Sequence, residues 1–161
     1  MRKIIIIIVL SFLAMIGEFL LYNIFGFWFK PNLAIILIAF FNLTWGIRYG
    51  IMAAVACGIL KDSFSASFFG LNIFSFIVSV YVVTFIRRYF YYLGTRSSRV
   101  RIIFVVCVIN VMVQYMVHVT LSTVNFWPMV GSILLPEVIT TMLVCSYLLK
   151  HLKNWVVQFH S

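Results

Sequence analysis

The stretch 58-GILKDSFSASFFG-70 interrupts a chain that is otherwise mostly apolar. The apolar run that starts at Ile51 ends at Lys61 and Asp62, and a serine-rich turn follows before the next apolar run begins. An interruption of this kind is a loop outside a membrane, a break at membrane depth, or a binding site. The choice depends on how many of the surrounding apolar segments cross a membrane.

The composition indicates that lipid is the main solvent of the chain. Of its 161 residues, 65% are hydrophobic and only 9% are charged, whereas about 25% of the residues of a soluble domain are charged. A net charge of +9 is typical of basic loops that face anionic lipid, and we expect no nucleic-acid partner. The three cysteines form no C-x-x-C pair, so the sequence predicts no metal site and no cofactor.

Six apolar segments are candidates for transmembrane helices, which need about 20 mostly apolar residues. Their approximate bounds are 4–25, 32–47, 50–62, 68–86, 102–124 and 129–149. The third is the shortest, because about 13 residues rise roughly 20 Å, less than the roughly 30 Å hydrocarbon core. The first follows a basic start, as in a signal peptide. Its apolar run is longer than that of a signal peptide, and no small-residue cleavage site follows it. We therefore interpret this segment as a retained transmembrane span.

The positive charges decide whether segment 50–62 crosses the membrane. With six crossings and a cytoplasmic N-terminus, ten Lys and Arg residues lie inside, and Lys30 and Lys61 lie outside. If the segment only dips in and returns, four lie inside and eight outside. Short cytoplasmic loops are enriched in Lys and Arg. The sequence therefore predicts an all-α membrane protein with six transmembrane helices and both termini cytoplasmic, forming one integral membrane domain over residues 1–161.

Three carboxylates lie at membrane depth, where ionisable groups are costly. Glu18, Asp62 and Glu137 all fall towards the predicted outer side. They either converge on a pocket for a cation or cationic substrate, or are separate groups with local hydrogen bonds. For Asp62, the simpler interpretation is a cap whose carboxylate accepts the amides of Ser63–Ser65. The alternative is that Asp62 marks an outer recess for a partner helix.

A polar stripe runs along the fifth segment, where Asn110, Gln114, His118 and Ser122 recur at every fourth position. Steps of four drift only about 40° on a helix, so these side chains share one face. A stripe of this kind usually forms hydrogen bonds that hold neighbouring helices together. The alternatives are the wall of a polar cavity and a proton path through His118.

Small residues recur at a spacing of four in the third segment, in the pairs Ala53–Cys57 and Ala54–Gly58. Such pairs let two helices approach closely. The longest connection, 87-RRYFYYLGTRSSRVR-101, is basic and aromatic. We expect it to anchor the topology at the membrane interface, or to bind anionic lipid or an acidic cytoplasmic partner.

The order of these motifs resembles the MreD family of rod shape-determining membrane proteins. In that family, Pro, then Asp or Asn, then an apolar residue open the second span. A short Gly-rich span follows, which ends in Gly-x-x-x-Asp, and another Gly lies about eight residues later. The matching residues here are Pro31, Asn32, Leu33, Gly58, Asp62 and Gly70. The resemblance is firmest over about 30–90, and Lys61 and Glu18 match nothing in the pattern.

The resemblance implies a non-enzymatic scaffold of the cell-elongation (rod) complex in the bacterial cytoplasmic membrane. Such a scaffold binds MreC, a single-span protein. Through it the scaffold connects, directly or indirectly, to MreB filaments, to RodA and to a class B penicillin-binding protein, and so links peptidoglycan synthesis to cell shape. The family is also similar in architecture to the six-span substrate-binding subunits of energy-coupling-factor transporters.

Two other functions stay open. A substrate-binding subunit of a vitamin-type transporter is the alternative, and it requires an outward pocket lined by Asp62, Glu18, Glu137 and the fifth-segment stripe. A proton-coupled carrier that uses His118 ranks last, because the chain lacks the inverted repeat common in such carriers. The sequence holds no nucleotide-binding loop, G-x-S-x-G elbow or H-E-x-x-H motif, so we expect no enzyme activity.

Overall fold

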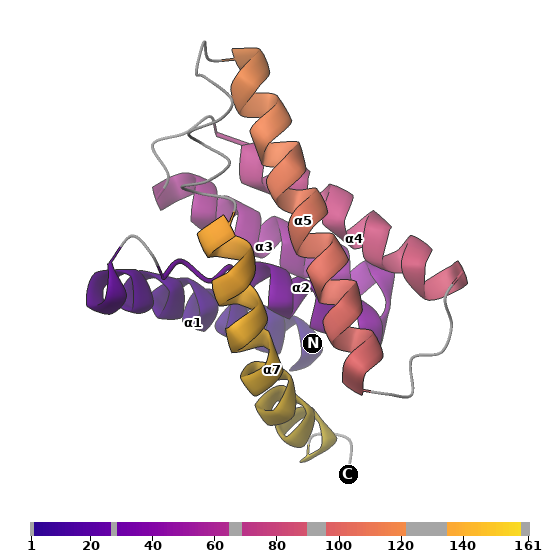
Figure 1. Cartoon of the computed structure of the whole chain (residues 1–161). Coiled ribbons are helices and arrows are strands. Elements are labelled where there is room, and N and C mark those ends of the chain that lie inside the picture. Colours follow the sequence, from indigo (N-terminus) through magenta and orange to yellow (C-terminus); the bar gives the residue numbers. More distant parts are fainter. Residues whose placement is uncertain (1, 27–28, 65–68, 90–95, 122–134, 159–161) are drawn as a thin grey trace.

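The computed structural model describes residues 2–26, 29–64, 69–89, 96–121 and 135–158. Within these ranges every regular element is an α-helix. The helices are α1 (Arg2–Phe25), α2 (Leu33–Trp45), α3 (Ile47–Phe64), α4 (Leu71–Tyr89), α5 (Arg96–Leu121) and α7 (Leu135–Gln158). In Figure 1, α5 and α7 cross in front of α2, and both contact it.

Three of these helices are long and apolar enough to cross a membrane: α1, α4 and the Val100–Val117 part of α5. Helix α2 and the Pro136–Cys145 part of α7 are apolar but shorter. The prediction of an all-helical membrane protein is therefore confirmed at this level.

The prediction that the third helix is the shortest is wrong. Helix α2 has 13 residues and α3 has 18. A single residue, Gly46, makes the turn between them with a φ of 95°, and its amide bonds to the Asn42 carbonyl at 3.1 Å. Helix α3 is longer than the predicted segment 50–62 because residues 47–49 extend it at its start and Ser63 and Phe64 extend it at its end.

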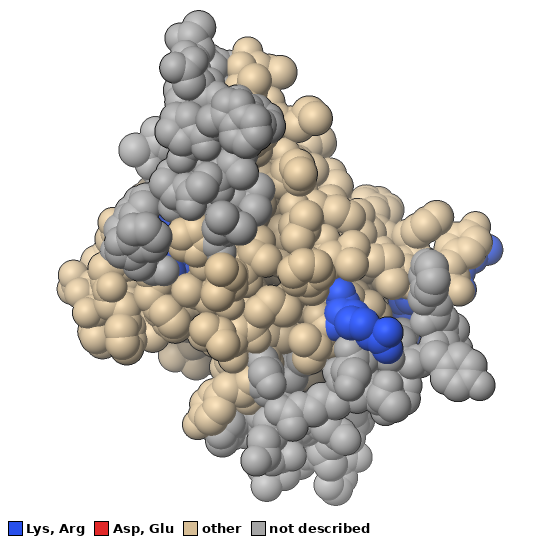
Figure 2. Space-filling view, viewed as in Figure 1, with Lys and Arg blue, Asp and Glu red and all other residues tan. Residues whose placement is uncertain are grey.

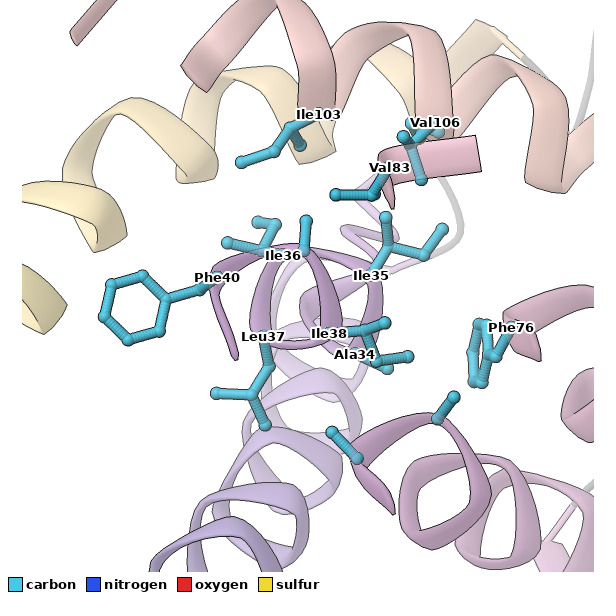
Figure 3. Packing of buried hydrophobic residues seen from close by; sticks show 14 of the residues in the cluster. Ala34, Ile35, Ile36, Leu37, Ile38, Phe40, Phe76, Val83, Ile103 and Val106 are labelled. Carbon is cyan, nitrogen blue, oxygen red and sulfur yellow. The ribbon is translucent and has the colours of Figure 1, made fainter. Parts of the chain in front are cut away.

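Helix α2 is the centre of the bundle. All nine residues from Ala34 to Asn42 are buried, and α2 contacts α1, α3, α4, α5 and α7. In Figure 3, Ile35 and Ile36 point towards Val83 and Ile103, while Leu37 lies on the opposite side of the helix. A helix that is apolar all round can be covered by other helices or by lipid, and here five helices surround it. Because protein encloses α2, its length of about 20 Å does not have to match the thickness of the bilayer.

Helix α1 lies at the edge of the bundle against α2 and α3. Ile7 and Ser11 are its buried residues, and large apolar side chains such as Ile8, Phe12 and Phe19 are exposed. Lipid is as apolar as these side chains, so their exposure costs nothing in a membrane. Ile7, Leu10 and Ala14 attach α1 to the core. Polar contacts of Lys3 and Glu18 add to this packing.

Candidate functional site

Asp62, near the end of α3, caps the start of α4. One carboxylate oxygen, Oδ2, accepts the amides of Gly70 at 2.9 Å and Ile73 at 3.3 Å. The other, Oδ1, accepts the Asn72 amide at 3.1 Å and the Asn72 side-chain Nδ2 at 2.8 Å. The first amides of a helix lack partners within the helix, and a negative charge there is stabilised by the helix dipole. Asp62 is only 3% exposed, so lipid and water supply no substitute acceptor.

This cap differs from the expected one. A cap on the Ser63–Ser65 amides requires the chain to turn directly after Asp62, but α3 continues through Ser63 to Phe64. The Ser63 hydroxyl instead donates to the Ile59 carbonyl of its own helix at 2.7 Å. Ser65 lies outside the described residues. The carboxylate therefore joins two helices and does not stabilise its own turn.

Gly58 brings α3 close enough for that cap to form. It lies one turn before Asp62, and a Cβ at this position would stand 2.7 Å from the Cα of Ile73 and 3.0 Å from its amide nitrogen. No side chain fits at that distance from a neighbouring backbone. Its small-residue companions Ala53, Ala54 and Cys57 are also buried. Gly70 completes the arrangement, because it has a φ of 97° and accepts the Phe74 amide at the start of α4.

Pro31 and Asn32, both buried, open α2 at a junction with α7. The Asn32 amide donates to the Thr141 hydroxyl at 2.9 Å, and Asn32 Nδ2 donates to Glu137 Oε1 at 2.7 Å. The Asn32 side-chain oxygen accepts the Ile35 amide at 3.4 Å, as an N-cap does. One side chain thus caps its own helix and fixes the position of α7, which starts 103 residues later.

Glu18 and Lys61 tie α1 and α3 to the same junction. Glu18 Oε1 accepts the Ala34 amide of α2 at 3.1 Å, and Glu18 Oε2 pairs with the Lys61 ammonium at 3.1 Å. Lys61 also lies 5.7 Å from the centre of the Phe76 ring. We call Glu18, Asn32, Lys61, Glu137 and Thr141 the α2 junction.

The three carboxylates therefore serve two separate contacts. Glu18 and Glu137 meet at the α2 junction, where Lys61 and the positive end of the α2 dipole oppose their charge. Asp62 follows Lys61 directly but binds the start of α4. Among the residues that the structure describes, no group of three or more His, Cys, Asp and Glu side chains is placed to hold a metal ion.

The polar stripe of α5 contacts α4 at two of its four positions. Gln114 Nε2 donates to Asn72 Oδ1 at 2.9 Å and to the Ser75 hydroxyl at 3.3 Å. The Ser79 hydroxyl donates to Asn110 Oδ1 at 3.4 Å. These contacts are interhelical hydrogen bonds. The side chain of His118, and the whole of Ser122, lie outside the described residues.

The sequence interpretation missed two buried asparagines that link helices. Asn72 connects Asp62 of α3 to Gln114 of α5. Asn42 donates to the Val80 carbonyl at 2.8 Å and to the Thr84 hydroxyl at 3.0 Å, so it joins α2 to α4. A lone amide within an apolar run was the available signal, because a polar group at membrane depth needs a partner.

Breaking the Glu18–Lys61 pair from one side should destabilise the protein more than removing it completely. Glu18→Ala leaves Lys61 partly buried without its main partner, and we expect a loss of about 3 kcal/mol of unfolding free energy. Both side chains retain some exposure, at 15% and 20%, so we take the lower end of the range for buried pairs. Titrating the purified chain from mild detergent into denaturing detergent, followed by circular dichroism, measures this loss.

The double variant Glu18→Leu with Lys61→Met is the control. It removes both charges, and we expect it to recover at least half of that loss. A double variant that is less stable than Glu18→Ala would contradict a role for charge pairing here. Glu18→Gln keeps a carbonyl oxygen for the Ala34 amide, so it should fall between the wild type and Glu18→Ala.

Comparison of the chain with protein-family models, with curated proteins and with solved structures found no significant match.

Proposed function

We propose that this chain is a non-enzymatic membrane scaffold of the MreD type. In this role it binds an MreC-like single-span protein in the bacterial cytoplasmic membrane. Through that protein it connects, directly or indirectly, to RodA, a class B penicillin-binding protein and MreB. The outcome is control of peptidoglycan synthesis and cell shape by the rod complex.

One observation carries the proposal: the residues that match the family pattern form the two joints of the helix bundle. Gly58, Asp62 and Gly70 join α3 to α4 through a close backbone approach and a carboxylate cap. Pro31 and Asn32 open α2 where α7 is attached. The spacing of the motif therefore has a physical reason in this chain, which supports its use as a family signature.

The carboxylates are occupied by hydrogen bonds within the chain, and this favours a scaffold over the transporter alternative. A substrate-binding subunit needs Glu18, Asp62 and Glu137 to face a ligand pocket. In the structure each of them accepts hydrogen bonds from the chain itself. Their oxygens hold helix ends in place, and a rigid helical body of this kind is suited to presenting outer faces to partner helices.

The proposal includes six crossings with both termini in the cytoplasm. Lys30 and Arg88 are exposed at opposite ends of the bundle, and all three native cysteines are buried. A membrane-impermeant maleimide applied to intact spheroplasts should therefore label Lys30→Cys. It should label Arg88→Cys only after the membrane is opened. Labelling of both variants in intact spheroplasts would exclude this orientation.

Co-purification tests the scaffold itself. The tagged full chain, extracted in mild detergent from its own membranes, should retain a single-span protein with a periplasmic domain and no small organic ligand. Mass spectrometry identifies both classes of companion. A chain that elutes without any elongation component, or with a vitamin-like molecule in equal amount, would refute the scaffold role.

A further inference from the structure

Basic side chains surround the Gly46 turn, where α2 passes into α3. The Lys3 ammonium of α1 lies 5.5 Å from the centre of the Trp45 ring and 5.3 Å from that of Tyr49. The Arg87 guanidinium of α4 donates to the Asn42 carbonyl at 3.2 Å. Arg48 and Arg88 are exposed. We call Lys3, Arg48, Arg87 and Arg88 the basic end.

None of the Asp and Glu side chains, all of which the structure describes, is close enough to neutralise the basic end. The sequence contains three acidic residues, and all three make contacts near the opposite ends of the helices. Lys3 and Glu18 are 15 positions apart on α1, which is about 22 Å along the helix. Arg48 and Asp62 are 14 positions apart on α3, about 21 Å. Both separations are several times the roughly 4 Å over which an ion pair forms.

The helix dipoles do not neutralise this positive charge, because α1 and α3 begin at the basic end while α2 and α4 end there. Neither α1 nor α3 has an acidic residue in its first turn. Arg2, Lys3 and Arg48 stand where acidic side chains are normally favourable. In the view of Figure 2, most of the visible Lys and Arg atoms lie beside α5 and at the end of α4, a few lie on the opposite side, and no Asp or Glu atoms are visible.

The aromatic residues place this charge at the depth of lipid headgroups. Trp45 and Tyr49 flank the turn, and Tyr89 is exposed where α4 ends. Trp and Tyr concentrate where hydrocarbon meets the headgroup layer. An anion that meets the basic end at this depth is therefore part of a lipid, whereas an acidic protein segment would have to enter the headgroup layer.

We infer that the basic end binds the phosphate groups of anionic phospholipids in the adjacent leaflet. Arg48 and Arg88 supply the exposed contacts. Lys3 and Arg87, which are held by their own partners, supply fixed positive charge behind them. The inference does not depend on the scaffold role. The basic end shares Arg87 and Arg88 with the lipid contact expected at 87–101; residues 90–95 and the side chains of 96–99 of that segment lie outside the described residues.

Electron spin resonance of labelled lipids tests the inference on the full chain. The protein is reconstituted in phosphatidylcholine vesicles with spin-labelled phosphatidylglycerol or phosphatidylcholine at trace levels. The wild type should prefer phosphatidylglycerol at low salt and lose most of that preference at high salt. In the double variant Arg48→Gln with Arg88→Gln, the preference should fall about fivefold or more, given roughly fivefold per basic side chain near an anionic surface.

The control is Lys30→Gln, which removes an exposed cation near the other end of the helices. It should leave the preference for phosphatidylglycerol unchanged, and all variants should unfold at the same detergent fraction as the wild type. An equal loss in Lys30→Gln would overturn the assignment, because any interfacial cation would then suffice. Displacement of the labelled lipid by an equimolar amount of polyglutamate would overturn it in favour of an acidic protein partner.

Discussion

Gly58→Ala should unfold at a clearly lower fraction of denaturing detergent than the wild type. An added Cβ would lie 2.7 Å from the Ile73 Cα and equally close to its Cγ1, and the Cα belongs to the backbone of α4. A side chain can rotate away from such a contact, but a helix backbone can only shift. Alanine gains about 1 kcal/mol of helix propensity over glycine. We nevertheless expect a net loss of about 2 kcal/mol, because overpacking costs up to about 3 kcal/mol.

The size of this effect comes from its link to Asp62. If α4 moves away from Gly58, the first amides of α4 move away from the Asp62 carboxylate one turn further along α3. The substitution therefore strains a helix contact and loosens a cap at the same time. In Gly58→Ala, a further Asp62→Ala change should cost less than it costs in the wild type, because part of the cap is already lost.

Gly17→Ala is the matched control for Gly58→Ala. It introduces the same methyl group inside a helix, where the nearest atom is the end of the Leu33 side chain, Cδ1, at 3.0 Å. Leu33 can rotate, so we expect stability equal to or slightly above that of the wild type from the gain in helix propensity. If Gly17→Ala and Gly58→Ala are equally stable, the close approach of α3 to Ile73 does not require glycine at position 58.

The pattern of apolar segments predicted the helices because each apolar run in this chain forms the body of one helix. It misjudged helix ends wherever polar residues continue the helix. Arg48 lies in the part of α3 that precedes the predicted start at residue 50, and Ser63 continues the helix beyond the predicted end at Asp62. Hydropathy registers which residues favour lipid. Where a helix stops depends on its caps, such as the amide of Gly46 bonded to Asn42.

The sequence indicated which residues form the candidate site, but it did not indicate which residues they contact. Glu18, Asn32, Asp62 and Glu137 stand out because polar groups at membrane depth need a reason to be there. Apart from the Ile35 amide, which Asn32 caps locally, their partners lie 8 to 109 residues away, as with Asp62 and Gly70 or Asn32 and Thr141. One sequence carries no information on such pairings, because they depend on which helix faces come together. The central place of α2 was not predictable from hydropathy either, because α1 is also apolar on nearly every face and lies at the edge of the bundle.

Asp62→Ala should be the most destabilising single substitution of a polar residue at the α3–α4 joint. It removes the acceptor for three backbone amides and the Asn72 side chain, in a place that is 3% exposed. Hydrogen bonds to a charged group contribute about 1.5–3 kcal/mol, and unpaired buried donors add a penalty. We expect a loss of about 4 kcal/mol in the detergent titration, together with reduced abundance in the membrane. Normal abundance with selective loss of the partner would instead assign Asp62 to a binding recess.

Exchanging the side chains of Asp62 and Asn72 distinguishes loss of the helix cap from a general loss of polar groups at this joint. In Asp62→Asn, the amide group at position 62 brings N–H donors against the backbone donors of α4, so this variant should also be clearly destabilised. Adding Asn72→Asp returns a carboxylate to the first turn of α4, where the helix dipole favours it. It also keeps an acceptor for Gln114 Nε2. We expect the exchange to recover about 1 kcal/mol or more relative to Asp62→Asn. Ser63→Ala, which removes a hydroxyl bonded within α3, should match the wild type. If the exchange is no more stable than Asp62→Asn, the carboxylate must act through its position on α3 and not through its charge at the start of α4.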